Sequence, residues 1–420
     1  MNGERPFAGK RVAIVHPAWH SCGTYQVVIG QIEAWTSLGA EVVTIACSDQ
    51  PGFKPSRSWI WNGYRKATPE LDAHERHYAG APLHAVLEPA FLAKVLWPYI
   101  HGDQAVIRAG MISRAMLDGR LSNETFDLVH CNHFFCMPVA LRLARGAKIL
   151  LDSHDLQARQ FTIMNEGAPW LRPLASYDQM LARELDWMAR ADVLLHLNAE
   201  EDDAFRALLP QKKHVLLYPP VPAVPTGPGG DEIVLVSSWN RANVESALWF
   251  LREVAPRAPQ VCVRIYGSVD AGVRSADAAT YEKYRGWFAG RVERIDDIYA
   301  NAKLALLPTT SGTGLSIKSV EAMASGLPLI ATAHAFRGMN IDPSRLGNVT
   351  LAEDAETFAA ALRDAAARPP STAAQRSASA TRAAYDAHFS EEAYARQLAG
   401  IATPLIAATG RAPVPGARAG

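Results

Sequence analysis

Residues 306–332 read LLPTTSGTGLSIKSVEAMASGLPLIAT, and this stretch indicates the fold class of the chain. An apolar strand is expected to end at Leu307 and to lead into a loop that contains two glycines. Helical character follows at 316–324 and ends at Gly326, after which a second strand is expected at 327–331. Both strands are apolar without alternation, so both of their faces must be covered, which is typical of a parallel sheet between helices.

The same alternation of short apolar strands and longer helical patterns extends from this stretch toward both ends of the chain. Residues 25–38, for example, predict a helix that ends at Gly39. Further strands are expected at 11–16, 41–46, 128–131, 148–152, 193–197, 215–218, 233–238, 261–266 and 304–307. Repeated strand–helix–strand units predict an α/β protein whose parallel sheets are doubly wound and Rossmann-like.

A break between two such sheets is expected at 219–230, PPVPAVPTGPGG, because prolines fix φ and glycines loosen the backbone. We predict an N-terminal Rossmann-like domain at 1–218, a linker at 219–230, a C-terminal Rossmann-like domain at 231–400, and a return segment with a disordered tail at 401–420. A chain of 420 residues that is 49% apolar is long enough for two cores. Because ligands of open α/β sheets bind beyond the carboxyl ends of the strands, the two domains are expected to face a common cleft.

Composition excludes several classes of protein. Lys and Arg total 42, as do Asp and Glu, so the formal net charge is zero and a nucleic-acid binder is disfavoured. The five cysteines include no C-x-x-C pair, which favours thiols in a reducing compartment. The first ten residues are polar, unlike a secretion signal, and charged residues and prolines interrupt the apolar stretch at 83–100. We therefore expect a cytoplasmic protein.

The loop and helix at 308–324 are suited to binding a phosphorylated ligand. A glycine loop before a helix leaves backbone N–H groups unpaired at the positive end of the helix dipole. Lys318 and Glu321 are three residues apart and share one helix face. The cation can meet a diphosphate and the carboxylate can accept hydrogen bonds from ribose, which fits a nucleotide-sugar, and an exposed ion pair is the alternative.

Residues 311–332 closely resemble the donor-site motif of the retaining GT-B glycosyltransferases of family 4, the glycosyl transferases group 1. That motif has a carboxylate, seven further residues, and then a Glu in the run Glu-Ala-Met-Ala-x-Gly-x-Pro, which residues 321–328 match (EAMASGLP). The segments 234–256, 291–299, 126–155 and 193–221 resemble other parts of the family. The resemblance covers most of the chain outside 51–122 and the C-terminal tail.

This resemblance implies a GT-B fold in which an N-terminal acceptor domain and a C-terminal donor domain face a cleft. It also implies retaining, metal-independent transfer of a sugar from a UDP- or GDP-type donor to a hydroxyl acceptor, with no other cofactor. A glycan or a lipid-linked acceptor is compatible with it, with at most peripheral membrane contact and no nucleic acid. The implied catalytic residues are His154, Lys318 and Glu321, and the implied donor-binding residues are Gly23, Arg241, Thr313, Gly314, Leu315, Lys318 and Glu321.

Individual roles also follow from the resemblance. Glu321 would bind ribose, the backbone N–H groups of Gly314 and Leu315 would meet the sugar and phosphate, and His154 would lie near the transferred sugar. Gly23, in the loop after the first strand, would let the backbone approach the diphosphate.

Two positions depart from the family pattern. Thr313 stands where a carboxylate is usual, so a charge that would stabilise an oxocarbenium-like centre is missing. Arg241 stands alone where a basic pair is usual, and Lys318 is the candidate to replace the second charge. The alternatives are therefore a nucleotide-sugar epimerase on the same fold and a degenerate protein that binds a nucleotide-sugar or a partner without catalysis.

Other polar segments have simpler interpretations. The acidic run at 200–203 is interpreted as a solvated first helical turn, and no metal site is predicted. Basic and aromatic residues at 51–80 are interpreted as an irregular surface loop, and 88–97 as a packed helix, with a lipid-linked acceptor as the alternative contact. His16, His130 and His133 follow strands at the expected cleft edge but rank below His154.

Overall fold

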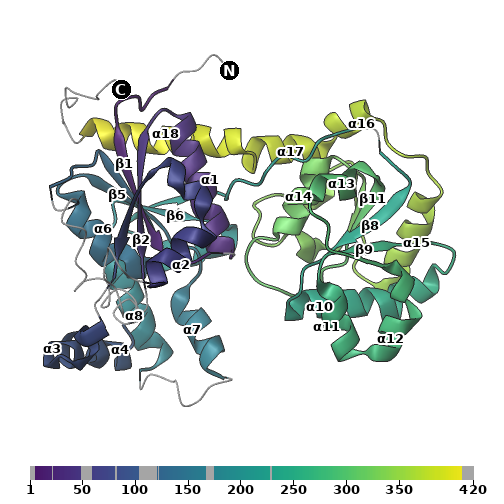
Figure 1. The fold of residues 1–420 in the computed structure, drawn as a ribbon. Coiled ribbons are helices and arrows are strands. Elements are labelled where there is room, and N and C mark those ends of the chain that lie inside the picture. Colours follow the sequence, from purple (N-terminus) through teal and green to yellow (C-terminus); the bar gives the residue numbers. More distant parts are fainter. Residues whose placement is uncertain are drawn as a thin grey trace. The chain divides into compact units, whose positions relative to one another are not determined.

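The computed structural model describes residues 5–20, 22–48, 59–80, 83–103, 121, 123–166, 175–227 and 229–408, and it divides into two compact units. The first unit comprises Met1–Pro219 together with Tyr394–Gly420, and the second comprises Pro220–Ala393. Each unit is built around one parallel sheet (Figure 1). Of the predicted return segment and disordered tail at 401–420, residues 409–420 lie outside the described residues.

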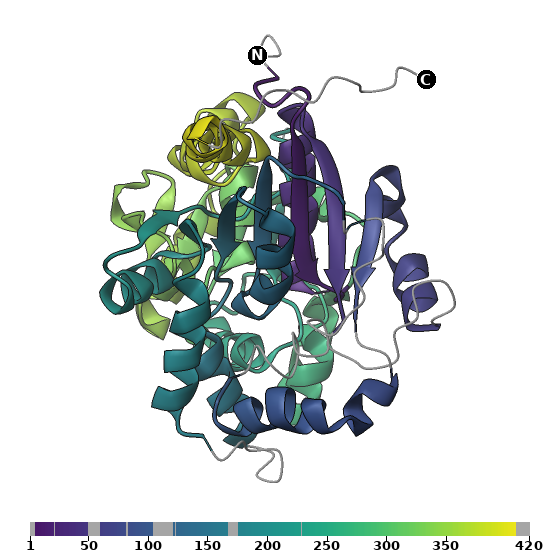
Figure 2. The same ribbon diagram turned by 90° about the vertical axis from the view of Figure 1, so that its left-hand side faces the viewer.

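The sheet of the first unit has seven strands in the order β3-β2-β1-β4-β5-β6-β7, and all neighbouring pairs are parallel. The strands are β1 Arg11–Pro17, β2 Glu41–Cys47, β3 Glu75–Ala79, β4 Leu128–Asn132, β5 Lys148–Asp152, β6 Val193–His196 and β7 Lys213–Leu216. Their side chains alternate between two buried faces: Val12 and Ile14 enter one core cluster, whereas Ala13 and Val15 enter the other. Helices lie on both sides of this sheet (Figure 2), so the predicted doubly wound class is confirmed.

The helices of the first unit follow from the same pattern. They are α1 Gly23–Ser37, α2 Trp59–Ala67, α3 Pro89–Phe91, α4 Trp97–Ile100, α6 Met137–Ala144, α7 Gln157–Glu166, α8 Tyr177–Met188, α9 Ala199–Leu208 and α18 Glu391–Ala408, with short 3-10 turns η1 Pro69–Ala73, η2 Leu83–Leu87 and η4 Phe134–Cys136 and a π-turn η3 Leu92–Leu96. The last helix, α18, places Tyr394, Leu398 and Ile401 in the same core cluster as Val12 and Ile14. The unit is therefore completed by residues from the far end of the chain.

The interpretation of 51–80 as an irregular loop is wrong from residue 59 onward, while 51–58 lie outside the described residues. Helix α2 and strand β3 occupy this stretch. Trp61 and Tyr64 are buried, and the Trp61 ring lies 4.4 Å from that of Tyr78 between centroids. Trp61 and Tyr64 are three residues apart in α2, so their side chains share one helix face and pack inward. Trp61 and Tyr64 therefore belong to a core instead of a nucleic-acid surface.

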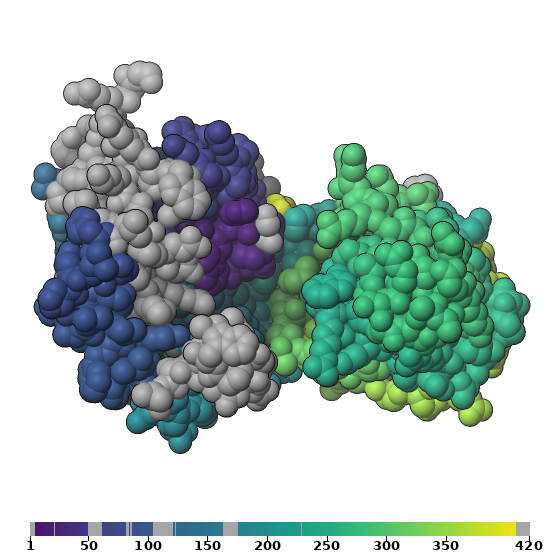
Figure 3. Space-filling view, turned by 60° about the horizontal axis from the view of Figure 1, so that its bottom comes forward, coloured from purple at the N-terminus to yellow at the C-terminus, as the bar shows by residue number. Residues whose placement is uncertain are grey.

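The sheet of the second unit has six strands in the order β10-β9-β8-β11-β12-β13, again all parallel. The strands are β8 Glu232–Val236, β9 Arg264–Tyr266, β10 Phe288–Gly290, β11 Ala302–Leu307, β12 Leu329–Ala331 and β13 Val349–Leu351. The helices are α10 Arg241–Trp249, α11 Val269–Ala276, α12 Ala278–Lys283, α13 Ile295–Ala300, α14 Ile317–Ser325, α15 Ala355–Ala366, α16 Ala373–Ser377 and α17 Ala380–His388, with short turns η6 Phe250–Val254, η7 Ala255–Arg257, η8 Arg285–Trp287, η9 Ala333–Phe336 and η10 Pro343–Arg345. Figure 3 shows this unit from the side of α10, α11 and α12.

The proline-rich segment that precedes β8 belongs to the second unit from Pro220 onward, although it forms no helix or strand in its described residues. Val221 and Val224 are buried. The backbone of Val221 accepts a hydrogen bond from the Tyr385 hydroxyl at 2.7 Å, and that of Val224 accepts one from Arg382 at 2.9 Å. Among the described helices, none combines the length and the apolar character that crossing a bilayer requires.

Candidate functional site

The strand order of the second sheet identifies where its ligand site should lie. Strands β8 and β11 are neighbours, although β9 and β10 come between them in sequence and lie on the far side of β8 (Figure 1). The winding reverses at this pair, and ligands of open α/β sheets bind beyond the carboxyl ends of the two strands at such a reversal. The segments that leave those ends are the turn before α10 and the loop 308–316 before α14.

The loop after β11 contains a run of backbone N–H groups that are available to bind a ligand. The backbone N–H groups of residues 311–318 donate no hydrogen bond to any described residue. Gly312 and Gly314 have φ of 124° and 67°, a region that favours glycine, and they let the loop turn its N–H groups toward the start of α14. The helix N-cap, Ser316, supplies no side-chain cap. A glycine loop that leads into an uncapped helix N-terminus is suited to binding an anion.

Helix α14 is held firmly at its opposite end. Gly326 ends the helix with φ of 68°, and a Cβ there would lie 2.2 Å from the backbone oxygen of Arg376. Arg376 donates to the Ser325 carbonyl and Arg382 to the Ala324 carbonyl, each at 2.9 Å. Cations at the carboxyl end of a helix complement its dipole. The glycine in the EAMASGLP run is thus required by packing, and the helix that carries Lys318 is fixed in place.

Lys318 links the two segments of the site. Its Nζ donates to Asn243 Oδ1 at 2.7 Å, and Asn243 Nδ2 in turn donates to the Ser238 carbonyl at 2.9 Å. Burial, reinforced by the positive charge of Arg337, lowers the pKa of Lys318 to about 8. The ammonium therefore lies half-buried between α10 and α14, where a bound anion would restore its ordinary pKa.

Glu321 lies one helical turn along the same face. Its carboxylate forms no hydrogen bond or ion pair with any described residue, and burial raises its pKa to about 7. Burial and then the nearby Glu321 carboxylate raise the pKa of the buried Tyr299 hydroxyl well above its ordinary value. Lys318 and Glu321 therefore do not form the exposed ion pair that was the alternative for their spacing. A half-buried carboxylate without a partner is a candidate ligand-binding group.

Arg241 begins helix α10, and its side chain is 93% exposed. Its Nε donates to Glu245 at 2.9 Å, and the second oxygen of Glu245 accepts from the Ser311 hydroxyl at 3.0 Å. This chain of contacts places Arg241 beside the start of the 311–318 loop. Thr313, in the middle of that loop, is exposed.

Sequence reasoning missed Arg337, which follows the short turn after β12. Its guanidinium lies against the loop, because a Cβ built on Gly312 would be 2.9 Å from Arg337 Nη2. The next residue, Gly338, packs against Gly314 and Leu315, where an added Cβ would meet backbone atoms at 3.1 Å. Arg337 is therefore a second cation at the site, in addition to Lys318. Its signal in the sequence is its place beyond the carboxyl end of the strand next to β11.

The first unit has a polar cluster at the corresponding edge of its own sheet, where β1 and β4 are neighbours. Gly23 begins α1 after β1, and a Cβ there would meet nothing within 4 Å, so its described neighbours do not require a glycine. His154 follows β5 and donates from Nε2 to Asn132 Oδ1 at 2.8 Å. Its ring stacks on that of His133 with centroids 4.1 Å apart.

His154 is held in one protonation state. The residue is buried, and burial lowers its pKa to about 4, so the imidazole is neutral near pH 7. Because Nε2 carries the proton that it donates to Asn132, Nδ1 is left as an acceptor. His130 has a different role, since its Nε2 is hydrogen-bonded to the buried Asp152 carboxylate within the sheet.

Two doubly wound parallel-sheet units, each with a polar edge at its winding reversal, define the GT-B class of fold. Residues 230–368 match the family model of the glycosyl transferases group 1, which confirms the resemblance found in the donor motif. A search of the curated proteins by sequence gives no match.

Solved structures show the same fold over most of the chain. HepE of Anabaena in complex with UDP has a TM-score of 0.60 at 14% identity, covering 94% of this chain and 100% of that one. The sucrose-phosphate synthase of Thermosynechococcus elongatus has a TM-score of 0.56 at 17% identity, covering 95% and 100%. A UDP-forming trehalose-phosphate synthase of Burkholderia vietnamiensis has a TM-score of 0.54 at 14% identity, covering 95% and 100%. This chain therefore has the GT-B fold, and residues 230–368 of its second unit match the glycosyl transferases group 1 model.

Proposed function

We propose that the protein transfers a sugar from a nucleoside diphosphate-sugar to a hydroxyl acceptor, with retention of the anomeric configuration and without a metal ion or other cofactor. The observation that carries this proposal is the run of backbone N–H groups at 311–318 that donate to no residue in the described part of the chain, next to the Lys318 ammonium. An uncapped helix N-terminus and a half-buried cation together suit a diphosphate.

The donor would be bound by groups of the second unit. The diphosphate would accept hydrogen bonds from the N–H groups of the loop, with Lys318 and Arg337 balancing its charge. Glu321, whose carboxylate has no partner among the described residues, would accept hydrogen bonds from the ribose hydroxyls. A UDP-type donor is favoured because HepE, which has the same fold, is bound to UDP in one solved structure and to UDP-glucose in another.

Catalysis would rest mainly on stabilising the leaving group. As the bond between the sugar and the phosphate breaks, negative charge builds up on the diphosphate, and fixed N–H dipoles stabilise it without reorganisation. Lys318 and Arg337 supply the positive charge that a divalent cation supplies in other transferases. We propose that His154 in the first unit accepts a hydrogen bond at Nδ1 from a hydroxyl of the sugar or the acceptor, since a neutral imidazole is a poor proton donor.

Thr313 favours one alternative function, which is binding of a nucleotide-sugar without transfer. A carboxylate at this position would stabilise positive charge on the sugar, and the exposed threonine hydroxyl carries none. A protein that binds a nucleotide-sugar without transferring it is the function that this residue would suit. An epimerase on the same fold is the other alternative, and it differs in that it needs no acceptor.

The test is a panel of UDP- and GDP-sugars incubated with the full chain, with and without a cell extract that supplies hydroxyl acceptors. We expect release of free nucleotide that depends on the acceptor, falls sharply in Glu321→Gln, and leaves the transferred sugar with the anomeric configuration of the donor. Donor binding without nucleotide release would establish the binding protein, and conversion of one donor into its epimer without an acceptor would establish the epimerase. Loss of activity on treatment with a chelator, in a chain whose Tm is unchanged by the treatment, would contradict metal independence.

A further inference from the structure

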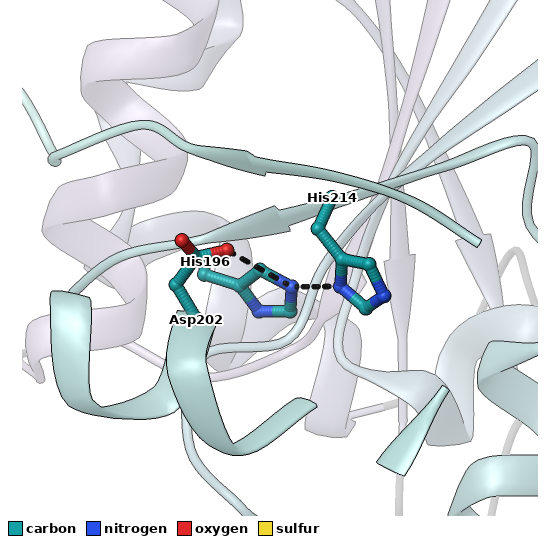
Figure 4. A group of neighbouring side chains, drawn as sticks. All are labelled: His196, Asp202 and His214. Carbon is teal, nitrogen blue, oxygen red and sulfur yellow. Dashed lines mark hydrogen bonds and ion pairs between the residues drawn. The ribbon is translucent and has the colours of Figure 1, made fainter. Parts of the chain in front are cut away.

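A second cluster of chemically competent side chains lies in the first unit, apart from the polar edge that holds His154. It consists of His196 at the end of β6, His214 in β7 and Asp202 in α9 (Figure 4). His196 Nε2 lies 2.8 Å from His214 Nδ1 and 3.9 Å from Asp202 Oδ1. One nitrogen or oxygen atom from each residue falls within 4.8 Å of the other two, and all three residues are buried.

In each imidazole, the ring nitrogen that faces away from the centre of the cluster already has a hydrogen-bond partner. His214 Nε2 lies 2.8 Å from the Leu209 carbonyl, so it must carry the proton, and Nδ1 is left as a lone pair facing the centre of the cluster. His196 Nδ1 lies 2.9 Å from the Ser153 hydroxyl, which can donate to it or accept from it. Ligating histidines commonly have such a partner on the second nitrogen, because it fixes the ring and the tautomer.

The strongest indication of a bound ligand is the Asp202 carboxylate, because a hydrogen-bonded pair of histidines alone would not require it. Its Oδ1 is buried and has no hydrogen-bond partner among the described residues, whereas Oδ2 accepts from Arg206 at 2.9 Å. The interpretation of the acidic run at 200–203 as a solvated turn is therefore wrong for Asp202, which points inward at the first turn of α9. A buried carboxylate oxygen left unpaired beside two imidazoles is costly unless something else binds it.

We propose that His196, Asp202 and His214 bind a borderline divalent cation of the Zn²⁺ type, with water as the fourth ligand. Two imidazole nitrogens and one carboxylate oxygen form a donor set that Zn²⁺ accepts in tetrahedral geometry. The observed separations of 2.8 and 3.9 Å lie on either side of the value that this geometry requires. That value is about 3.4 Å for metal–ligand bonds of about 2.0–2.1 Å.

Metal binding requires the His196 proton to move from Nε2 to Nδ1, and no proton needs to be released. His196 would carry its proton on Nδ1 and donate it to Ser153, whose hydroxyl can turn to the Leu195 carbonyl 3.3 Å away. Nε2 would then be free for the metal, while His214 is already in the required tautomer. Arg206 is the opposing charge, but its side chain is 47% exposed, so solvent screens its repulsion of the cation. The metal would tie β7, at the edge of the sheet, to β6 and α9.

The experiment uses the full chain, purified without a polyhistidine tag, stripped with a chelator and titrated with Zn²⁺ and with Co²⁺. We expect one ion per chain by elemental analysis, the visible absorption of tetrahedral Co²⁺, and a raised Tm with Zn²⁺. His214→Gln and Asp202→Asn should each weaken binding at least tenfold. The matched control is His77→Gln, which changes a buried histidine of β3, the strand at the other edge of the same sheet, where it is paired with Glu75.

The results of these experiments either support or overturn the metal-site proposal. A wild-type chain that takes up no stoichiometric Zn²⁺, or one whose binding is unchanged in Asp202→Asn, overturns the proposal. If His214→Gln fails to fold, the Asp202→Asn variant and the wild-type Co²⁺ spectrum decide the question. None of these measurements depends on sugar transfer, so this proposal and the proposed function can fail independently.

Discussion

Replacing Lys318 by methionine removes the half-buried ammonium of the donor loop and keeps most of its apolar stem. In the free protein the ammonium donates a hydrogen bond to Asn243 Oδ1, and burial lowers its pKa to about 8. A diphosphate would give it a full counter-charge. We therefore expect Lys318→Met to impair nucleotide binding far more than folding.

The magnitude follows from the type of bond that is lost. A hydrogen bond between charged groups contributes about 1.5–3 kcal/mol, which corresponds to a roughly 10- to 150-fold weaker Kd for UDP. Against this, the variant leaves Asn243 Oδ1 without its donor, which costs about 1 kcal/mol, and it removes a buried charge, which offsets part of that cost. A net change of this size shifts Tm by no more than about 2–4 °C in a unit of this length.

The assay is calorimetric titration of UDP and GDP into the wild type and the variant at pH about 7, with the thermal transition measured alongside. The matched control is Lys303→Met, because Lys303 lies at the start of β11 in the same unit and donates to the Ala366 carbonyl at 2.8 Å. If Lys318→Met binds the preferred nucleotide within about twofold of wild type, or Lys303→Met weakens it equally, the assigned role of Lys318 is refuted.

Three further predictions concern the same chemistry. Nucleotide affinity should rise as pH increases through about 7, where Glu321 ionises, and fall above about 8, where Lys318 loses its proton, giving a bell-shaped profile by calorimetry. A monotonic profile would contradict both assignments. Gly326→Ala should destabilise the protein by more than about 3 kcal/mol in urea unfolding, because its Cβ would overlap a backbone oxygen as well as strain φ. Gly314→Ala, with nearly the same φ but open space, should cost only about 1 kcal/mol, so equal costs would show that packing at Gly326 has been misjudged. His154→Gln should lower turnover while leaving UDP affinity unchanged, and parallel losses in both would place its role elsewhere.

Much of the fold and part of the site could be predicted because the signals are local. Continuous apolar runs identified most of the parallel strands but not β3, β10 or β13, and Gly326 marked the end of α14 at the observed residue. Where a predicted strand was too long, a local reason is visible: β12 begins at Leu329 rather than 327 because Pro328 has no N–H to pair. Lys318 and Glu321 were found because their spacing on a helix is fixed.

The features that sequence reasoning missed depend on contacts between distant segments. Arg337 reaches the loop from beyond a different strand, and the partner of Lys318, Asn243, lies on another helix. Neither contact leaves a periodic signal. Asp202 was misjudged because an acidic run resembles a solvated turn, and only its place beside His196 and His214 shows that this carboxylate points inward. In each case the sequence gives the type of side chain but does not give the residues that surround it in the fold.

The position of α18 has a consequence for how the protein is made. The first unit needs Tyr394, Leu398 and Ile401 to cover one face of its sheet, yet a ribosome synthesises these residues after the whole second unit. The second unit can therefore be completed while the first still exposes an apolar face. A fragment that stops at Pro219 should be prone to aggregate, whereas a circularly permuted chain that begins with the last helix should let the first unit fold as it emerges.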